Sequence, residues 1–159
     1  MAEPLPELVD FSDYGNDWEK YLNAIYEIYM KHIVNAGFSY HGLPVKYRFL
    51  PPTDGKEFGF WHLISEGEDE ENRTPDLRRC ERILWVAWIL RQAGTNPDIL
   101  WYENKRGSNT HVVLWYPLNH YALILAKRSG YYLLKSAHVI LPHREKTFEK
   151  EWREYWGKG

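Results

Sequence analysis

Four strand-like segments, separated by very short connections, limit the fold of this chain more than any other feature. The segments are Ile99–Glu103, Thr110–Tyr116, His120–Lys127 and Tyr131–Val139. They are joined by a stretch around Gly107, by Pro117–Asn119 and by the tight turn Arg128–Gly130. A parallel pair needs a much longer crossover, so connections of this length favour antiparallel neighbours. We therefore predict a four-strand antiparallel meander.

Helical patterns flank these strands. Asn16 or Asp17 can cap a first helix, and Gly37 ends it. Its apolar stripe, at steps of three and four, consists of Trp18, Tyr21, Leu22, Ile25, Ile28, Tyr29 and Ile33. A second helix is expected from Thr74-Pro75-Asp76 to about Ala93, because a hydroxyl, a proline and a carboxylate are typical of helix starts. The segment Arg144–Trp156 has aromatic residues at helical spacing and predicts a closing helix that packs on the sheet.

Two further runs between the first two helices have the pattern of strands. Val45–Leu50 and Phe58–Ser65 flank Pro51–Gly55, which has the composition of a turn, so we expect a hairpin. Helices packed on an antiparallel meander, with this additional N-terminal hairpin, make an α+β fold. The 159 residues correspond to a single domain, 1–159, in which residues 1–14 form a loosely held arm.

Composition excludes several classes of protein. The 8 Trp, 12 Tyr and 6 Phe exclude a disordered chain, and a net charge of −2 excludes a bulk basic field for nucleic acid. One cysteine, Cys80, excludes an internal disulfide and a cysteine-based zinc site. Neither a secretion signal nor an apolar run near the roughly 18 residues of a membrane span is visible. We expect a cytoplasmic protein with no membrane partner.

His62 is the first candidate for chemistry. Strand alternation would place it with Phe58, Phe60 and Ile64 on one face, beside an acidic loop at residues 66–71. An imidazole there can act as a general acid or base, because its ordinary pKa lies near neutrality. The alternative is a half-buried structural histidine.

A cluster of arginines on the second helix is the next candidate. Asp76, Arg79 and Arg82 step by three and share an edge, and Arg78 lies four residues before Arg82. Guanidinium groups bind phosphate in pairs of hydrogen bonds and stabilise charge in its transition state. Arg73 lies just before the helix, near its positive end. The alternative is a solvated helix face with ordinary ion pairs.

The last strand supplies a hydroxyl and an imidazole. One face carries Tyr132, Leu134, Ser136 and His138, and the other carries Tyr131, Leu133, Lys135 and Ala137. A hydroxyl beside an imidazole can hold a phosphate and protonate a leaving oxygen. No nucleophile elbow precedes Ser136, and the neighbouring strand adds His120 and Tyr121. The alternative is an edge strand whose polar residues face water.

Metal and nucleotide cofactors are not indicated by the sequence. His62, His120, His138 and Asp76 could converge in principle, but neither an HExxH motif nor closely spaced histidines occur. P-loop and GxGxxG motifs are also absent from the sequence. We expect no metal and no cofactor.

Two segments carry a resemblance to a known family. FWHLI at Phe60–Ile64 and YALILAKRSGYYLLKSAHVI at Tyr121–Ile140 resemble phage- and mobile-element-associated members of the barnase/EndoU/colicin/RelE nuclease fold. The resemblance spans Phe58–Ile140 and implies metal-independent RNA cleavage, in which the 2′-hydroxyl attacks its own phosphate to give a 2′,3′-cyclic product. It also implies a toxin or phage-conflict role, with RNA as substrate and an inhibitor or antitoxin protein as a partner.

Two hypotheses of different classes follow. In the first, the chain is an endoribonuclease with His62, Arg79, Arg82, Ser136 and His138 as catalytic residues. Substrate binding then involves Arg73, Arg78, His120, Tyr121 and Lys135. In the second, it is a noncatalytic module of a mobile element that grips a protein or single-stranded nucleic acid through exposed Trp61, Trp101 or Trp115. Convergence of the catalytic candidates in one cleft favours the first.

Overall fold

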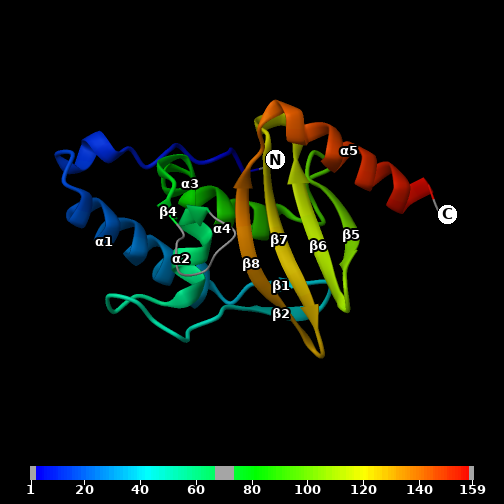
Figure 1. Ribbon diagram of the computed structural model, residues 1–159, viewed down its shortest axis with the longest axis horizontal. Coiled ribbons are helices and arrows are strands. Elements are labelled where there is room, and N and C mark those ends of the chain that lie inside the picture. The colour runs from blue at the N-terminus through cyan, green and yellow to red at the C-terminus, as the bar shows by residue number, and fades with distance from the viewer. Residues whose placement is uncertain (1–2, 67–73, 158–159) are drawn as a thin grey trace.

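The computed structural model describes residues 3–66 and 74–157 and has a mixed α+β fold around a curled six-strand sheet (Figure 1). The order of strands in the sheet is β1-β2-β8-β7-β6-β5. These strands are β1 (Ser39–Tyr40), β2 (Leu43–Lys46), β5 (Leu100–Arg106), β6 (Asn109–Tyr116), β7 (Tyr121–Arg128) and β8 (Tyr131–Val139). A separate short pair consists of β3 (Ser65–Glu66) and β4 (Thr74–Pro75). The predicted α+β class is confirmed.

Strands β5 to β8 pair in chain order. Each of the pairs β5–β6, β6–β7 and β7–β8 is antiparallel. Two of the tight turns contain Gly107 and Gly130 at positive φ, a conformation that glycine adopts without a steric penalty. Strand β2 joins the sheet on the other side of β8, in parallel, with Val45 opposite Tyr132.

Five helices surround the sheet in the described parts of the chain. They are α1 (Trp18–Ile28), α2 (Phe58–Ile64), α3 (Leu77–Glu81), α4 (Ile83–Gln92) and α5 (Pro142–Gly157). Of the two predicted caps, Asn16 and Asp17, it is the Asp17 side chain that caps α1, by accepting the backbone N–H of Lys20 at 3.2 Å. A π-helical turn extends α1 through Ile33, and Gly37 follows with φ 70°.

The predicted hairpin is wrong, because most of its second strand is helix α2. Gly59, Phe60, Leu63 and Ile64 are the buried residues of this segment, and their spacing is helical. A short apolar run of this kind fits strand alternation and helix periodicity equally well, so its neighbours decide the outcome. Here α2 packs against β8 and α3, which bury one helical side.

The predicted continuous second helix is also wrong. Thr74 lies in β4, and Asp76 is the cap, because its side chain accepts the backbone N–H of Arg78 at 2.9 Å. Arg82, with φ −99° and ψ 18°, separates α3 from α4. Arg79 and Arg82 therefore lie on opposite sides of a break rather than along one helix edge.

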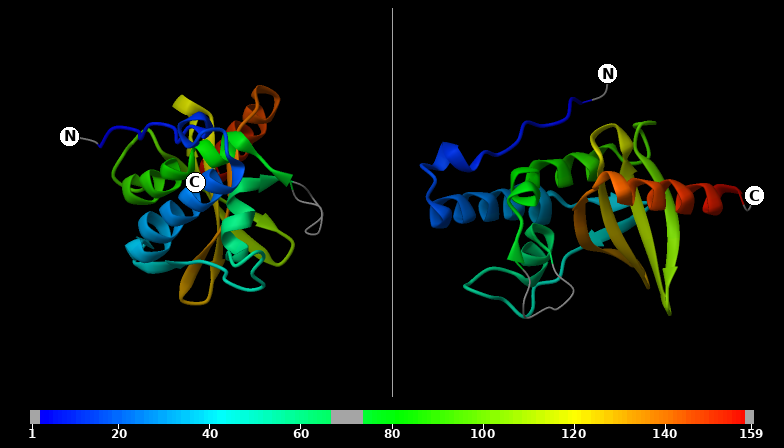
Figure 2. Two further views of the ribbon diagram at one scale, coloured as in Figure 1. Left: turned by 90° about the vertical axis from the view of Figure 1, so that its left-hand side faces the viewer. Right: turned by 45° about the horizontal axis from the view of Figure 1, so that its top comes forward.

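The sheet is covered on both faces, and Figure 2 shows α4 and α5 on opposite sides of it. The main core lies between the sheet, α1 and α4, and includes Tyr21, Trp88 and Leu123. A smaller core on the other face consists of Tyr102, Val113, Trp115, Ala122 and Ile140, packed against Phe148, Trp152 and Tyr155 of α5. The closing helix packs on the sheet, as predicted.

The N-terminal segment runs along α4 and is held by backbone contacts. The indole N–H groups of Trp88 and Trp85 donate to the carbonyls of Glu3 at 2.9 Å and Pro6 at 2.8 Å. The backbone N–H of Val9 donates to the Glu81 carbonyl at 2.8 Å. Part of the segment expected to be a loose arm is therefore anchored at three points.

Candidate active site

A polar cavity of about 490 Å³ lies between the second face of the sheet and the first half of α5. Ligand pockets in proteins span about 300–1,000 Å³, so one small ligand or one nucleotide-sized group matches this volume. The chemistry-bearing side chains of its lining are Ser136, His111, His138, His143, Arg79, Arg106, Arg144, Asn104, Glu66 and Glu151. The cavity therefore combines imidazole, hydroxyl and guanidinium groups.

A β-bulge in β8 turns Ser136 and His138 toward this cavity. Leu134 lies opposite Leu125, whereas Ser136 lies opposite Ile124, so Lys135 is an extra residue in the ladder. Such an insertion reverses the face on which the following side chains lie. Tyr132 and Leu134 consequently stay in the main core, whereas Ser136 and His138 lie on the opposite face of the sheet. The prediction that all four side chains share one face is therefore wrong.

Ser136 and His138 form a hydroxyl–imidazole pair in the lining of the cavity. The Ser136 Oγ and His138 Nε2 atoms are 2.9 Å apart. Either atom can donate, depending on which ring nitrogen carries the proton. The pair can thus position a hydroxyl on a phosphate oxygen and exchange a proton with a reacting group.

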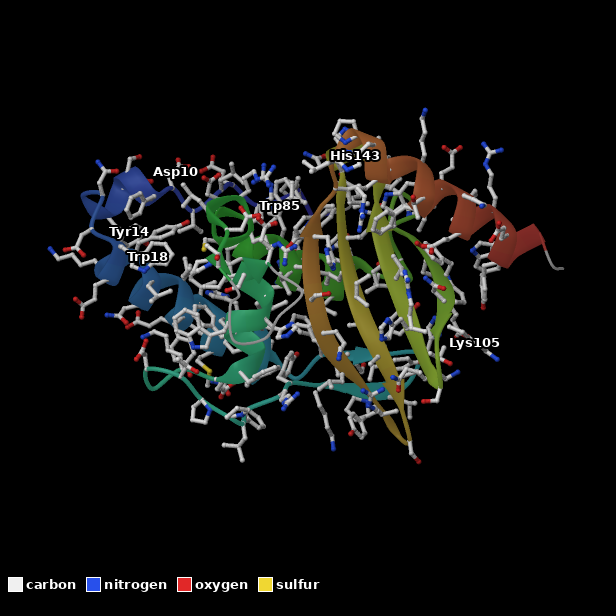
Figure 3. All side chains as sticks on the ribbon, in the orientation of Figure 1. Asp10, Tyr14, Trp18, Trp85, Lys105 and His143 are labelled. Atoms are coloured by element: carbon white, nitrogen blue, oxygen red, sulfur yellow. The ribbon has the colours of Figure 1, made fainter. Side chains whose placement is uncertain are left out.

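Two further histidines reach the cavity from other elements. His111 lies on β6, and His143 lies at the start of α5, just after the chain leaves β8 (Figure 3). Burial lowers the pKa of His111, and the nearby charges of Lys135, Arg106 and Arg128 lower it further. A lowered pKa favours the neutral imidazole at physiological pH, which is the form that accepts a proton.

Arginines from different elements supply positive charge to the lining of the cavity. The Arg79 Nη1 donates to the Ser65 carbonyl at 2.6 Å, and its Nε lies 3.8 Å from an Asp76 carboxylate oxygen. These contacts fix a largely buried guanidinium on α3. Arg144 lies in the first turn of α5.

Glu151 of α5 forms a polar wall of the cavity and ties the helix to β5. The Tyr102 hydroxyl donates to Oε1 at 2.8 Å, and the Asn104 Nδ2 donates to Oε2 at 3.0 Å. The Arg106 guanidinium lies 3.6 Å from the same oxygen. Burial and the adjacent carboxylate raise the pKa of Tyr102, so its hydroxyl stays protonated and remains a donor.

The structure brings three of the predicted catalytic residues, Arg79, Ser136 and His138, to one cavity. His62 lies on α2, with its ring centroid 4.9 Å from that of Phe58, and is not among the cavity-lining residues. The strand expected to carry it is a helix, which gives the side chain a different direction. Helix α2 nevertheless packs against β8 and α3, the elements that carry Ser136 and Arg79.

Other predicted residues lie apart from the cavity lining. The Arg82 guanidinium lies 5.0 Å from the Trp85 ring centroid and donates to the Arg78 carbonyl at 3.0 Å. Arg78 pairs with Asp76 at 3.5 Å. Arg73 and most of the acidic loop fall outside the described residues. Of the arginine cluster expected on one helix edge, Arg79 is the member that lines the cavity.

The candidates from β7 and β8 also differ from expectation. Tyr121 is 1% exposed in the main core, where its ring meets Trp85, so a bound substrate cannot reach it. His120 is 66% exposed and lies 3.6 Å from Glu145. Lys135 is the extra residue of the bulge and lies beside the cavity rather than in its lining.

Sequence reasoning missed His111, His143, Arg106 and Arg144. His111 alternates with Val113 and Trp115 along β6, so all three side chains lie on the face that α5 covers. Knowing which face α5 covers would have identified His111. His143 and Arg144 begin the closing helix, directly after the strand that carries His138. Residues at such a junction lie at the same end of the sheet as the last residues of the strand, so His143 and Arg144 are expected near His138.

Comparisons with protein-family models, curated proteins and solved structures found no match to this chain. Across residues 3–66 and 74–157, no cluster of three or more histidine, cysteine or acidic side chains has the arrangement of a metal site. In the same parts of the chain, no helix is long and apolar enough to cross a bilayer.

Proposed function

We propose that this chain is a metal-independent endoribonuclease of the toxin or phage-conflict type. In this reaction the 2′-hydroxyl of RNA attacks the adjacent phosphate and leaves a 2′,3′-cyclic phosphate. The observation that carries the proposal is the cavity that gathers the Ser136–His138 pair with further histidines and arginines. This reaction needs a general base, a general acid and cationic groups beside the phosphate, and each is present among these side chains.

The proposed roles follow from protonation and position. His111, whose pKa is lowered, takes the proton from the 2′-hydroxyl while the 2′-oxygen forms a bond to phosphorus. His138, held by Ser136, gives a proton to the 5′-oxygen as its bond to phosphorus breaks. Arg79 and Arg144 stabilise the charge on the remaining phosphate oxygens. A second step, hydrolysis of the cyclic phosphate, is not required.

The resemblance of Phe58–Ile140 to barnase/EndoU/colicin/RelE nucleases supports the same reaction. The residue assignment differs from the one that the resemblance implies. The general acid is His138 in this proposal, and His62 has no catalytic role. The alternative, a noncatalytic binding module, depends on exposed tryptophans. Trp115 is 4% exposed, and the Trp61 indole donates to the Thr53 carbonyl at 3.0 Å, so these side chains favour packing.

The test is an RNA cleavage assay with purified protein in EDTA. We expect a cyclic phosphate product by mass spectrometry and no cleavage of DNA of the same sequence, which lacks the 2′-hydroxyl. Loss of the acid in His138→Gln should slow cleavage by about 100-fold or more, because general acid–base catalysis contributes 10²–10⁴.

His62→Gln is the matched comparison, since it makes the same change on α2. Retained cleavage in His62→Gln beside lost cleavage in His138→Gln supports the cavity as the active site. The reverse pattern contradicts this assignment, and a wild-type protein that cleaves no RNA contradicts the function.

A further inference from the structure

Three positive side chains form a patch beside the cavity, named the basic strip: Lys46, Arg128 and Lys135. Lys46 ends β2, Arg128 ends β7, and Lys135 is the extra residue of the β8 bulge. The ladders place them on adjacent strands, because Lys46 lies opposite Leu133 and Arg128 lies opposite Tyr131.

The basic strip lies next to the active-site histidine of β6. His111 is opposite Ala126 on β7, and Ala126 is opposite Leu133 on β8. Burial lowers the pKa of His111, and the charges of Lys135 and Arg128 lower it further, in agreement with these ladder positions. The Lys46 Nζ lies 4.7 Å from the centre of the Tyr131 ring, so an aromatic face belongs to the same surface.

The strip has no carboxylate to neutralise it among the described residues. No ion pair involves Lys46, Arg128 or Lys135 in residues 3–66 and 74–157, whereas Lys127 pairs with Glu103 at 3.6 Å. The whole chain carries a net charge of −2, so this positive surface is a local feature. Several like charges held together without counterions attract a polyanion.

The path from the cavity to the strip is free of described helices. Helix α5 crosses this face near the end of β8 where the chain enters the helix, and the β7–β8 turn lies at the opposite end of the strands (Figure 1). A nucleic-acid strand with one nucleotide in the cavity can therefore continue along β8 toward this turn.

We propose that Lys46, Arg128 and Lys135 bind backbone phosphates of a single-stranded RNA that extends beyond the scissile phosphate. This inference rests on the proposed function. The strand must be unpaired because its reacting nucleotide enters a cavity between the sheet and α5. Tyr131 offers a ring on which a neighbouring base can stack, as aromatic side chains do in single-strand binding proteins.

The test compares two variants that remove the same charge. Lys46→Gln/Arg128→Gln/Lys135→Gln removes the strip, and Lys20→Gln/Lys31→Gln/Lys150→Gln removes three exposed cations from the helices. Binding of a fluorescent 2′-O-methyl RNA 12-mer, which cannot be cleaved, is measured by anisotropy over a range of salt concentrations. Unfolding midpoints of both variants establish that they fold.

The strip variant should lose about 2 units of the slope of log Kd against log salt, since each phosphate contact to a single strand contributes about 0.7. The helix variant should keep the wild-type slope. The loss should be larger for the 12-mer than for a 2′-O-methyl dinucleotide, which is too short to reach the strip from the cavity.

Equal slopes for the strip variant and the wild type overturn the inference, as does an equal loss in both variants. Stronger binding of a duplex than of the single strand also overturns it. Strip-dependent binding by a protein that never cleaves RNA contradicts the proposed function and leaves the strip as an RNA-binding surface.

Discussion

The two faces of the same sheet carry opposite chemistry. Side chains that point to α1 and α4, such as Leu123 and Leu125, are apolar and fully buried. On the opposite face, the apolar cluster around Trp115 gives way within a few residues to His111 and His138. One face therefore stabilises the fold, while the other presents titratable groups to a cavity.

The difference shows how alternation along a strand separates stability from chemistry. The β8 bulge extends this separation, because it keeps Leu134 in the main core while Ser136 and His138 face the cavity. Substitutions on the two faces should therefore differ in their effects on folding, from a large loss of stability in the main core to a small one at the cavity.

Leu123→Ala should destabilise the fold most, because Leu123 is 0% exposed in the main core. We expect a loss of about 2–5 kcal/mol in the free energy of unfolding, measured by urea denaturation. Its neighbour Ile124 points to the α5 side and is half-buried, so Ile124→Ala should cost less. An equal loss in both variants would remove the energetic contrast between the faces.

Glu151→Gln should loosen α5 from the sheet. It replaces a carboxylate that accepts hydrogen bonds from a buried tyrosine and from Asn104. The expected loss is about 1–3 kcal/mol, the range for disturbing a buried hydrogen bond with a charged partner. Glu154→Gln, at a side chain 59% exposed, is the control and should change the unfolding free energy little. Matching losses would mean that Glu151 does not tie α5 to β5.

Ser136→Ala should separate activity from stability. It removes the hydroxyl 2.9 Å from His138 Nε2, so cleavage should slow. The free energy of unfolding should fall by about 1 kcal/mol or less, the usual net contribution of one hydrogen bond. A large loss of stability with unchanged cleavage would place Ser136 among the structural residues instead.

Lys135→Gln should raise the pKa of His111, because it removes a positive charge that disfavours the imidazolium. The shift is measurable by NMR titration of the His111 ring, with Lys150→Gln as the remote control. A lowered pKa in the folded state means that stability falls as pH drops below the ordinary value of 6.5. The variant should weaken this acid-dependent loss, and an unchanged His111 pKa would contradict the placement of Lys135.

Much of the fold could be predicted from local signals. The Asp17 cap, the closing helix and the strands joined by glycine turns are specified by residues close in sequence. Helix α2 could not be identified, because a seven-residue apolar run satisfies two periodicities and its packing against β8 decides between them.

The candidate site was predictable only in part. Residue type pointed to Arg79, Ser136 and His138, since guanidinium, hydroxyl and imidazole groups suit phosphate chemistry. The bulge at Lys135 has no sequence signature here, so alternation placed Ser136 and His138 on the wrong face relative to Leu134. His111 required knowledge of which face α5 covers, and that is a tertiary contact.

The most direct test of the α5-face cavity as the site of phosphodiester binding is an NMR titration of the seven histidine rings. The probe is a 2′-O-methyl dinucleotide, which binds without being cleaved. We predict that the ring resonances of His111, His138 and His143 shift on binding, while those of His32 and His62 do not. Shifts at His62 without shifts at the three cavity histidines would contradict the account.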